Sequence, residues 1–221
     1  MTSDLPIYLL VVTLISLITN IIINRYYKIN ITKLLVFTLC MPILGVLSTM
    51  IMSFIESGSF KGTSFFGAVF IMPIMSIIFS TILKEERWKF FNLTAFLGMI
   101  TYATLKFRCY QYGCCIGKKM MTHNGPITFP SQIVEMTVGI ITFIALLLLY
   151  RKNKKRKDLL PILMVVYGIE RFFLNSFRLV KPIFAGLAYC HIWSILCTII
   201  GLIWLLIIKS KQNTKNYKKE I

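Results

Sequence analysis

Apolar runs close to the length of a bilayer crossing recur from one end of this chain to the other. A helix needs about 20 apolar residues to cross a hydrocarbon core of roughly 30 Å. The runs that approach this length occupy residues 5–23, 34–55, 65–83, 90–105, 131–150, 159–178 and 191–208, and the fourth is the shortest. Because no soluble domain fits between them, the sequence predicts a single transmembrane domain over residues 1–221. We expect an all-α polytopic membrane protein with about seven transmembrane helices.

The composition agrees with a membrane protein and argues against a nucleic-acid-binding one. Hydrophobic residues make up 57% of the 221 residues and charged residues 15%, and the mean hydropathy is +0.74. The formal net charge of +17 comes from Lys and Arg in short segments between apolar runs, whereas a nucleic-acid-binding protein carries them on a folded polar surface. The first segment, "MTSDLP", has no Lys or Arg ahead of its apolar run, so no cleavable signal peptide is predicted.

The distribution of Lys and Arg predicts the orientation in the membrane. The segments that follow the first, third, fifth and seventh runs hold 17 Lys and Arg residues, and the alternate segments hold 7. Cytoplasmic segments carry the excess of Lys and Arg, so the N-terminus is predicted outside and residues 209–221 form a basic cytoplasmic tail. This orientation places the segment "YQYGCCIGKK", residues 110–119, on the outer face.

The sixth run carries polar residues along one predicted helical face. In "YGIERFFLNSFR", Tyr167, Arg171 and Asn175 are spaced by four residues, and Arg178 follows three residues later. An arginine two turns inside a membrane helix is costly unless it faces the bundle interior, water or an anion. Glu135, one turn inside the fifth run, is predicted at the same depth, which makes an ion pair between Glu135 and Arg171 plausible.

Other polar residues near the outer ends leave two interpretations open. Glu170 points roughly 100° away from Arg171, and a structural ion pair is about as plausible for it as a functional role. Gln132, beside Ser131 at the start of the fifth run, is either a binding residue or a plain helix-end residue. His191, at the start of the seventh run, is a candidate base near neutral pH or a satisfied polar residue at a helix end.

The six cysteines fall into two groups. Cys40 and Cys197 lie within apolar runs and are interpreted as small hydrophobic residues. The other four, together with His123 and His191, raise a metal or disulfide interpretation on the outer side; they are Cys109, Cys114, Cys115 and Cys190. Because C-x4-C-C lacks the C-x2-C spacing of a strong zinc signature, no metal site is predicted from the spacing.

The segment around the paired cysteines reads more naturally as an anion site. Gly113 and Gly117 allow backbone amides to approach an oxyanion closely. Four cations flank the loop in the sequence, namely Lys106, Arg108, Lys118 and Lys119. In an outer leaflet the abundant anion is a phospholipid phosphate, so the loop is predicted to bind a phospholipid headgroup.

Taken in order, four segments resemble the prolipoprotein diacylglyceryl transferase family: "SGSFKGTSFFGAV", "LKFRCYQYGCCIG", "TFPSQIVE" and "YGIERFFLNSFR". The resemblance runs from about Ser57 to Ser194. Residues that match the family motifs are Gly113, Gly117, Pro130, Ser131, Gln132, Glu135, Tyr167, Gly168, Arg171 and Arg178. Departures also occur: Lys106 stands in for an arginine, Cys109 for an asparagine, Cys114 and Asn175 for glutamates, Thr128 for an arginine, Val134 for a tyrosine, and Phe66 for a histidine that is a candidate general base in the family.

The resemblance implies a transferase of the bacterial cytoplasmic membrane that moves a diacylglyceryl group from phosphatidylglycerol to the cysteine thiol of a lipobox-containing or other peptide, without a cofactor. The implied catalytic residues are Arg171, Glu135 and His191. The implied phospholipid-binding residues are Lys106, Arg108, Gly113, Gly117, Gln132, Tyr167 and Arg178. Candidates for thiol chemistry are Cys109, Cys114 and Cys115. With Phe66 unable to act as a base, the field of the arginines is the preferred means of activating the acceptor thiol.

Two alternatives remain open from the sequence. One is a non-catalytic, phospholipid-binding accessory protein of the membrane. The other is an outer-face thiol redox or metal protein that uses the four outer cysteines.

Overall fold

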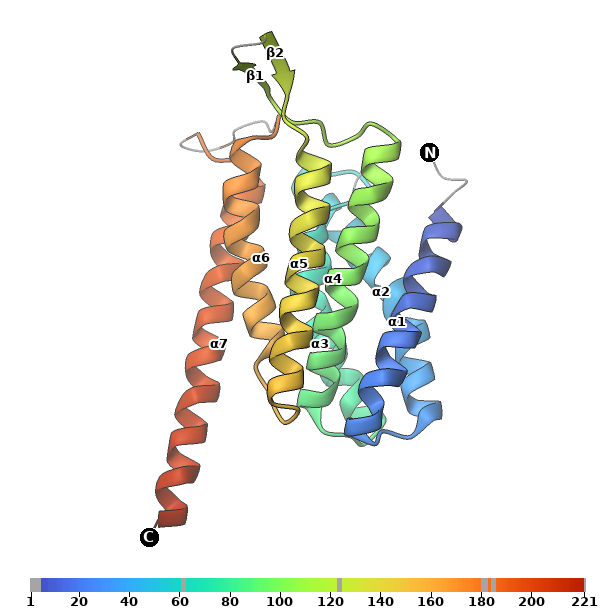
Figure 1. Cartoon of the computed structure of the whole chain (residues 1–221), viewed down its shortest axis with the longest axis vertical. Coiled ribbons are helices and arrows are strands. Elements are labelled where there is room, and N and C mark those ends of the chain that lie inside the picture. Colours follow the sequence, from blue (N-terminus) through green and yellow to red (C-terminus); the bar gives the residue numbers. More distant parts are fainter. Residues whose placement is uncertain (1–4, 61–62, 123–124, 180–182, 184–185, 221) are drawn as a thin grey trace.

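Over the residues that it describes, the computed structural model of the chain is a bundle of seven helices with a small hairpin at one end (Figure 1). The structure describes residues 5–60, 63–122, 125–179, 183 and 186–220. The helices are α1 (Leu5–Tyr27), α2 (Ile31–Ser57), α3 (Phe65–Ile82), α4 (Arg87–Gln111), α5 (Ser131–Lys152), α6 (Leu159–Ser176) and α7 (Tyr189–Glu220). The strands β1 (Lys119–Thr122) and β2 (Gly125–Thr128) pair in antiparallel register, with Lys119 opposite Thr128.

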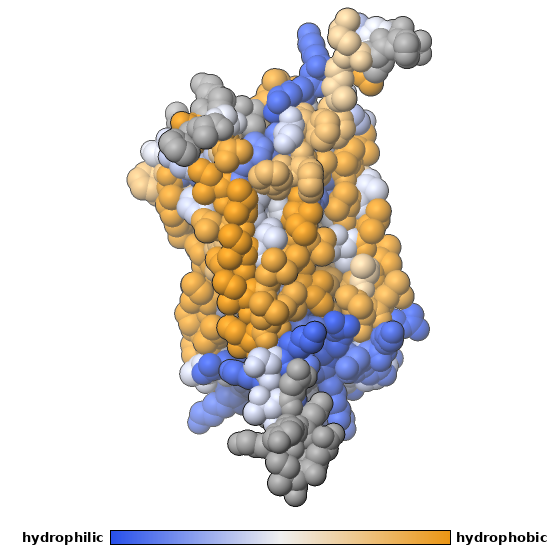
Figure 2. Space-filling view, turned by 90° about the vertical axis from the view of Figure 1, so that its left-hand side faces the viewer, coloured by the Kyte–Doolittle hydropathy of each residue, from blue (hydrophilic) through white to orange (hydrophobic). Residues whose placement is uncertain are grey.

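The prediction of an all-α polytopic membrane protein is confirmed. Six helices are long and apolar enough to cross a bilayer, and α4 is the remaining helix of the part of the chain that the structure describes. Large apolar side chains point outward along these helices, among them Ile7, Leu10, Ile18, Ile82 and Leu148. The face shown in Figure 2 carries a broad apolar band between two more polar ends. Such a surface is stable only in contact with lipid.

Helix α4 is less apolar because it lies inside the bundle, where it contacts α1, α3, α5 and α6. Two of its buried polar side chains bond to neighbouring segments. The Asn92 amide donates to the Tyr27 hydroxyl at 2.9 Å and to the Arg156 carbonyl at 2.7 Å. The Thr94 and Ser76 hydroxyls share a hydrogen bond of 2.6 Å. A helix covered by protein in this way does not need the hydropathy of a lipid-facing helix.

Two glycines permit the close helix contacts that shape the bundle. A Cβ atom at Gly67 of α3 would lie 2.0 Å from the Ser48 carbonyl oxygen of α2, and one at Gly168 of α6 would lie 2.3 Å from the Thr198 hydroxyl of α7. Small residues let membrane helices approach each other to backbone contact. The first contact joins α3 to α2, and the second joins α6 to α7.

The two ends of the bundle differ in charge. The start of α1 lies at the same end as the hairpin, and α7 extends past the opposite end (Figure 1). The opposite end carries basic residues and ion pairs such as Lys33–Glu85 at 3.0 Å and Arg156–Asp158 at 2.7 Å. Residues 209–220 of the predicted tail continue α7 as helix. This asymmetry agrees with the predicted orientation, in which the hairpin end faces outward.

Candidate active site

A single buried carboxylate near the hairpin end binds three cations from three parts of the chain. Glu135, in the second turn of α5, is fully buried. One of its oxygens lies 2.7 Å from Arg171 Nη1 of α6 and 3.5 Å from Arg178 Nη1. Lys106 Nζ of α4 pairs with the other oxygen. The predicted pair between Glu135 and Arg171 is therefore present.

This cluster carries more positive than negative charge. Three cations face one carboxylate, and the side chains of Lys106, Arg171 and Arg178 are all at least 86% buried. Buried cations repel one another strongly unless anions or hydrogen bonds compensate them. An arrangement with an excess of buried positive charge is suited to binding an anion, and the planar guanidinium groups match the geometry of a phosphate.

The predicted stripe on α6 lies inside the bundle and ends in unpaired polar atoms. Tyr167, Arg171 and Asn175 are all buried, and Asn175 has no exposed surface. Among the described residues, no hydrogen-bond partner reaches the Tyr167 hydroxyl or either polar atom of the Asn175 side chain. Buried polar groups are nearly always paired. Three polar atoms beside Arg171 are thus available to bond a polar ligand.

Aromatic residues close the cluster on the side of the membrane interior. The Tyr102 hydroxyl of α4 donates to Glu170 Oε1 at 2.8 Å, so Glu170 pairs with another helix. The ring of Phe65 lies against Tyr102 at 5.1 Å and against Tyr167 at 5.4 Å, measured between centroids. Sequence reasoning did not single out Phe65 or Tyr102, because nothing in their local pattern distinguishes them from other apolar positions.

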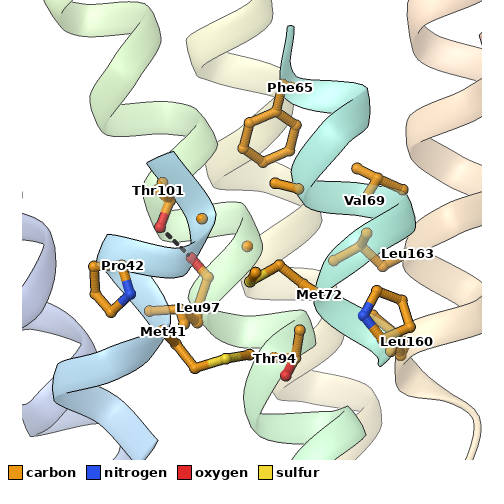
Figure 3. Close-up of a pocket in the computed structure, with 14 residues that line it drawn as sticks. Met41, Pro42, Phe65, Val69, Met72, Thr94, Leu97, Thr101, Leu160 and Leu163 are labelled. Carbon is orange, nitrogen blue, oxygen red and sulfur yellow. Dashed lines mark hydrogen bonds between the residues drawn. The ribbon is translucent and has the colours of Figure 1, made fainter. Parts of the chain in front are cut away.

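Beyond Phe65, an apolar cavity of about 50 Å³ lies between α2, α3, α4 and α6 (Figure 3). Its walls include Met41, Pro42, Val69, Leu97 and Leu163. A second cavity of about 40 Å³ lies toward α1 and shares Gly45, Phe65, Ala68 and Thr101 with the first. The polar cluster and the apolar cavities thus meet at Phe65. This arrangement suits an amphipathic ligand with an anionic head and apolar tails.

The cysteine loop, residues 112–118, is held against the cluster by backbone contacts. Gly117 pairs with Arg178 as an antiparallel bridge, and a Cβ atom there would lie 2.3 Å from the Phe129 carbonyl oxygen. The Lys118 amide donates to the Phe177 carbonyl at 2.8 Å, and its ammonium donates to the Ser176 carbonyl at the same distance. The predicted glycine is needed here because no side chain fits at position 117.

The start of α5 also holds this loop. The Ser131 hydroxyl donates to the Cys115 carbonyl at 2.5 Å, and the Gln132 amide donates to the Cys114 carbonyl at 2.6 Å. Gln132 therefore positions the loop through its amide nitrogen. Glu135 follows one turn later, which links the geometry of the loop to that of the charged cluster.

Three of the predicted outer cysteines come together. The sulfurs of Cys109, Cys114 and Cys115 lie within 4.8 Å of one another, and all three thiols are free. Burial raises the pKa of the Cys114 thiol. Contact with the Cys109 thiol lowers the pKa of Cys115 to about 5, and the charges of Lys106 and Arg178 act in the same direction. His123 lies outside the described residues.

The remaining predicted residues occupy the surroundings of the cluster. Arg108 lies over the rings of Tyr8 and Tyr112, at 5.7 and 5.2 Å from their centroids. His191 caps the start of α7, because its Nδ1 accepts the Ala188 amide at 3.3 Å. Gly113 adopts a φ of 60°, which glycine favours.

Position 66, where a histidine was expected from the resemblance, holds a packing residue. The Phe66 ring is buried, with its centroid 5.3 Å from that of Tyr167. No proton transfer is available at this position.

Comparison with known proteins decides the family. A family model described as prolipoprotein diacylglyceryl transferase matches residues 7–207. The chain belongs to this family. Its members include phosphatidylglycerol–prolipoprotein diacylglyceryl transferases that are similar to this chain over part of their length.

The transferase of Helicobacter hepaticus is 30% identical over 129 residues, which cover 53% of this chain and 44% of the relative. That of Oceanobacillus iheyensis is 27% identical, over 53% of this chain and 47% of the relative. That of Campylobacter lari is 27% identical, over 64% and 56%. The chain thus spans about half the length of the curated relatives it matches.

Proposed function

We propose that this protein transfers a diacylglyceryl group from phosphatidylglycerol to the cysteine thiol of a lipoprotein precursor, with release of glycerol phosphate. The observation that carries the proposal is the excess of buried cations around Glu135, beside unpaired polar atoms and above apolar cavities. The names of the three relatives supply the substrates. An anionic diacyl lipid matches both halves of the site.

In this proposal the phosphate of the lipid takes the place between the cations. Arg171 and Arg178 donate to its oxygens, and Lys106 adds a third positive charge. The Asn175 amide and the Tyr167 hydroxyl complete their hydrogen bonds with the headgroup. The acyl chains extend past Phe65 toward the two apolar cavities, the first of which is shown in Figure 3.

The proposed reaction is a displacement at the glyceryl carbon. A thiolate sulfur of the acceptor forms a bond to this carbon, and the bond between the carbon and the phosphate oxygen breaks. The electron pair remains on the phosphate, which leaves as glycerol phosphate with one more negative charge. Preorganised cations that meet a developing charge in a dry site are the strongest source of rate enhancement available here.

The acceptor thiol must lose its proton, since a free thiol with a pKa of about 8.5 is only slightly ionised at neutral pH. Within the described residues, Glu135 is occupied by its three cations and the Nδ1 atom of His191 by the Ala188 amide. The field of Lys106, Arg171 and Arg178 therefore supplies the electrostatic part of thiol activation.

The proposed setting is the bacterial cytoplasmic membrane, with the hairpin end outside and the C-terminal part of α7 inside. The excess of Lys and Arg at the end opposite the hairpin supports this orientation. Residues 1–221 then act as one transmembrane domain with a basic tail at 209–221. A substrate from the outer leaflet reaches the cluster from the hairpin end.

Reconstitution in nanodiscs tests the proposal. Purified chain is mixed with phosphatidylglycerol and a lipobox peptide, and mass spectrometry follows the thioether product together with free glycerol phosphate. The proposal expects both products in equal amounts. Binding of the lipid without either product would instead select the accessory lipid-binding alternative, and complementation of a strain depleted of its own transferase provides an independent check.

A further inference from the structure

The three sulfurs of the cysteine loop have the spacing of a metal–thiolate site. The Cys109 and Cys115 sulfurs lie 4.0 Å apart, and Cys114 completes a triangle whose sides do not exceed 4.8 Å. A zinc ion about 2.3 Å from each of three sulfurs in tetrahedral geometry holds them about 3.8 Å apart. Small side-chain rotations therefore bring the three sulfurs to bonding distance of one ion.

The backbone builds this triangle in a way that the spacing C-x4-C-C does not reveal. The Cys114 amide donates to the Cys109 carbonyl at 3.0 Å, which folds the chain back over the end of α4. Cys115 follows with a φ of 59°, a conformation that non-glycine residues rarely adopt. Hydrogen bonds from Ser131 and Gln132 hold the loop in this turn. The strained residue is thus fixed from outside the loop, as at functional sites.

Two cations lie close to one corner of the triangle. Lys106 precedes Cys109 by one turn of α4, and the charges of Lys106 and Arg178 act on the Cys115 sulfur. Three thiolates and one divalent cation carry a net charge of −1, which these cations offset. Soft thiolate ligands favour Zn²⁺ or Cu⁺ over hard cations. Since all three cysteines are half-buried, the triangle remains accessible from the outer end.

Three protein ligands leave a fourth position on zinc, the arrangement of catalytic rather than structural zinc sites. We propose that Cys109, Cys114 and Cys115 bind one Zn²⁺ whose fourth position takes the thiol of the acceptor peptide. This inference rests on the proposed function and adds to the field of the three cations a metal ion that ionises the acceptor thiol. A thiol bound to a metal ion is ionised at neutral pH.

The step balances without a redox partner. The acceptor thiol displaces water from zinc and loses its proton to solvent. Its sulfur then forms the bond to the glyceryl carbon, and the phosphate departs with the electron pair of the broken carbon–oxygen bond toward Arg171 and Arg178. The thioether product binds zinc weakly because it is neutral, and water replaces it.

Metal content of the purified full-length chain tests the binding site directly. About one zinc per chain is expected for the wild-type protein and for Cys40→Ser, in which the changed residue lies in α2 away from the loop. The variants Cys109→Ser, Cys114→Ser and Cys115→Ser are expected to lose it, with thermal unfolding as the check that they fold. A chain with three free thiols that takes up neither Zn²⁺ nor Co²⁺, or one with a disulfide between Cys109 and Cys115, would overturn the inference.

The fourth position is tested with Co²⁺ in place of zinc. The absorption bands of tetrahedral cobalt–thiolate are expected to shift and intensify when a lipobox peptide is added, and to stay unchanged with a peptide whose cysteine is replaced by serine. An unchanged spectrum with both peptides would refute the role of the acceptor ligand.

The two proposals fail in different ways. Full transfer activity after removal of zinc by a chelator would overturn the zinc site's role and leave the transferase proposal intact. A cobalt spectrum that responds to peptide in a chain that never releases glycerol phosphate would overturn the transferase proposal instead. The Arg171→Ala variant separates the two sites, because it is expected to keep its metal and lose transfer.

Discussion

Arg171 of α6 and Glu135 of α5 form a 2.7 Å ion pair whose side chains are only 9% and 1% exposed. Isolated charges at such a position are expensive. Lys106 and Arg178 approach the same carboxylate, so one anion compensates three cations. The arrangement is not neutral, and in the proposed function a bound phosphate supplies the missing negative charge.

The first prediction concerns the counter-charge itself. Glu135→Gln leaves three buried cations without an anion, and breaking a buried ion pair costs about 3–5 kcal/mol. We expect a lower midpoint of thermal unfolding in detergent, with a larger upward shift on adding phosphatidylglycerol than the wild-type chain shows. Glu86→Gln, at an exposed position before α4, is the control. Equal shifts in both variants would argue against a phosphate site at Glu135.

The second prediction uses the two buried asparagines. Asn175 has no partner for its amide, so Asn175→Leu is expected to leave stability unchanged or to raise it, and to weaken lipid binding about tenfold through the loss of roughly 1.4 kcal/mol. Asn92 is bonded to Tyr27 and to the Arg156 carbonyl. Asn92→Leu should therefore lower stability without changing lipid affinity, and the opposite pattern would assign Asn175 a purely structural role.

The third prediction concerns the apolar cavities. Ala68 lines both of them, so Ala68→Phe fills space that the acyl chains would enter. The KM for long-chain phosphatidylglycerol is expected to rise while that for a short-chain analogue stays the same. A uniform change for both lipids would show that the chains bind elsewhere.

The fourth prediction tests the orientation. In a chain whose outer cysteines are replaced by serine, Met121→Cys on the hairpin is expected to react with a membrane-impermeant maleimide in intact cells. Lys154→Cys, between α5 and α6, should react only after permeabilisation. Labelling in the reverse order would mean that the N-terminus faces the cytoplasm.

Much of the architecture follows from the sequence because the length of an apolar run and the periodicity of a helix are local properties of the chain. The predicted fifth run, 131–150, corresponds to α5, and the spacing of Tyr167, Arg171 and Asn175 correctly places them on the buried face of α6. The predicted and observed ends of a helix differ where tertiary contacts determine the end. The sixth run was predicted to reach residue 178, but α6 ends at Ser176 because the backbone of Arg178 pairs with Gly117.

Contacts between distant segments are harder to predict from the sequence. Nothing local indicates that Lys106 shares the carboxylate of Glu135, or that Gln132 holds the Cys114 carbonyl, since both depend on how α4 and α5 pack. The hairpin was not predicted, although the dipeptide Asn-Gly at 124–125 is a known hairpin signal. The triangle of sulfurs depends on a turn with positive φ at Cys115, which cysteine spacing does not encode.

The most direct test of the central claim is the release of glycerol phosphate from phosphatidylglycerol by Arg171→Ala compared with the wild-type chain. Loss of a preorganised charge that stabilises the leaving group lowers the rate by about 10²-fold or more. Lys209→Ala, exposed in α7 just past its apolar run, is the control and should react at the wild-type rate. Stoichiometric release of glycerol phosphate and thioether by the wild type, with loss of both in Arg171→Ala, is the predicted result; equal release by the two chains would contradict it.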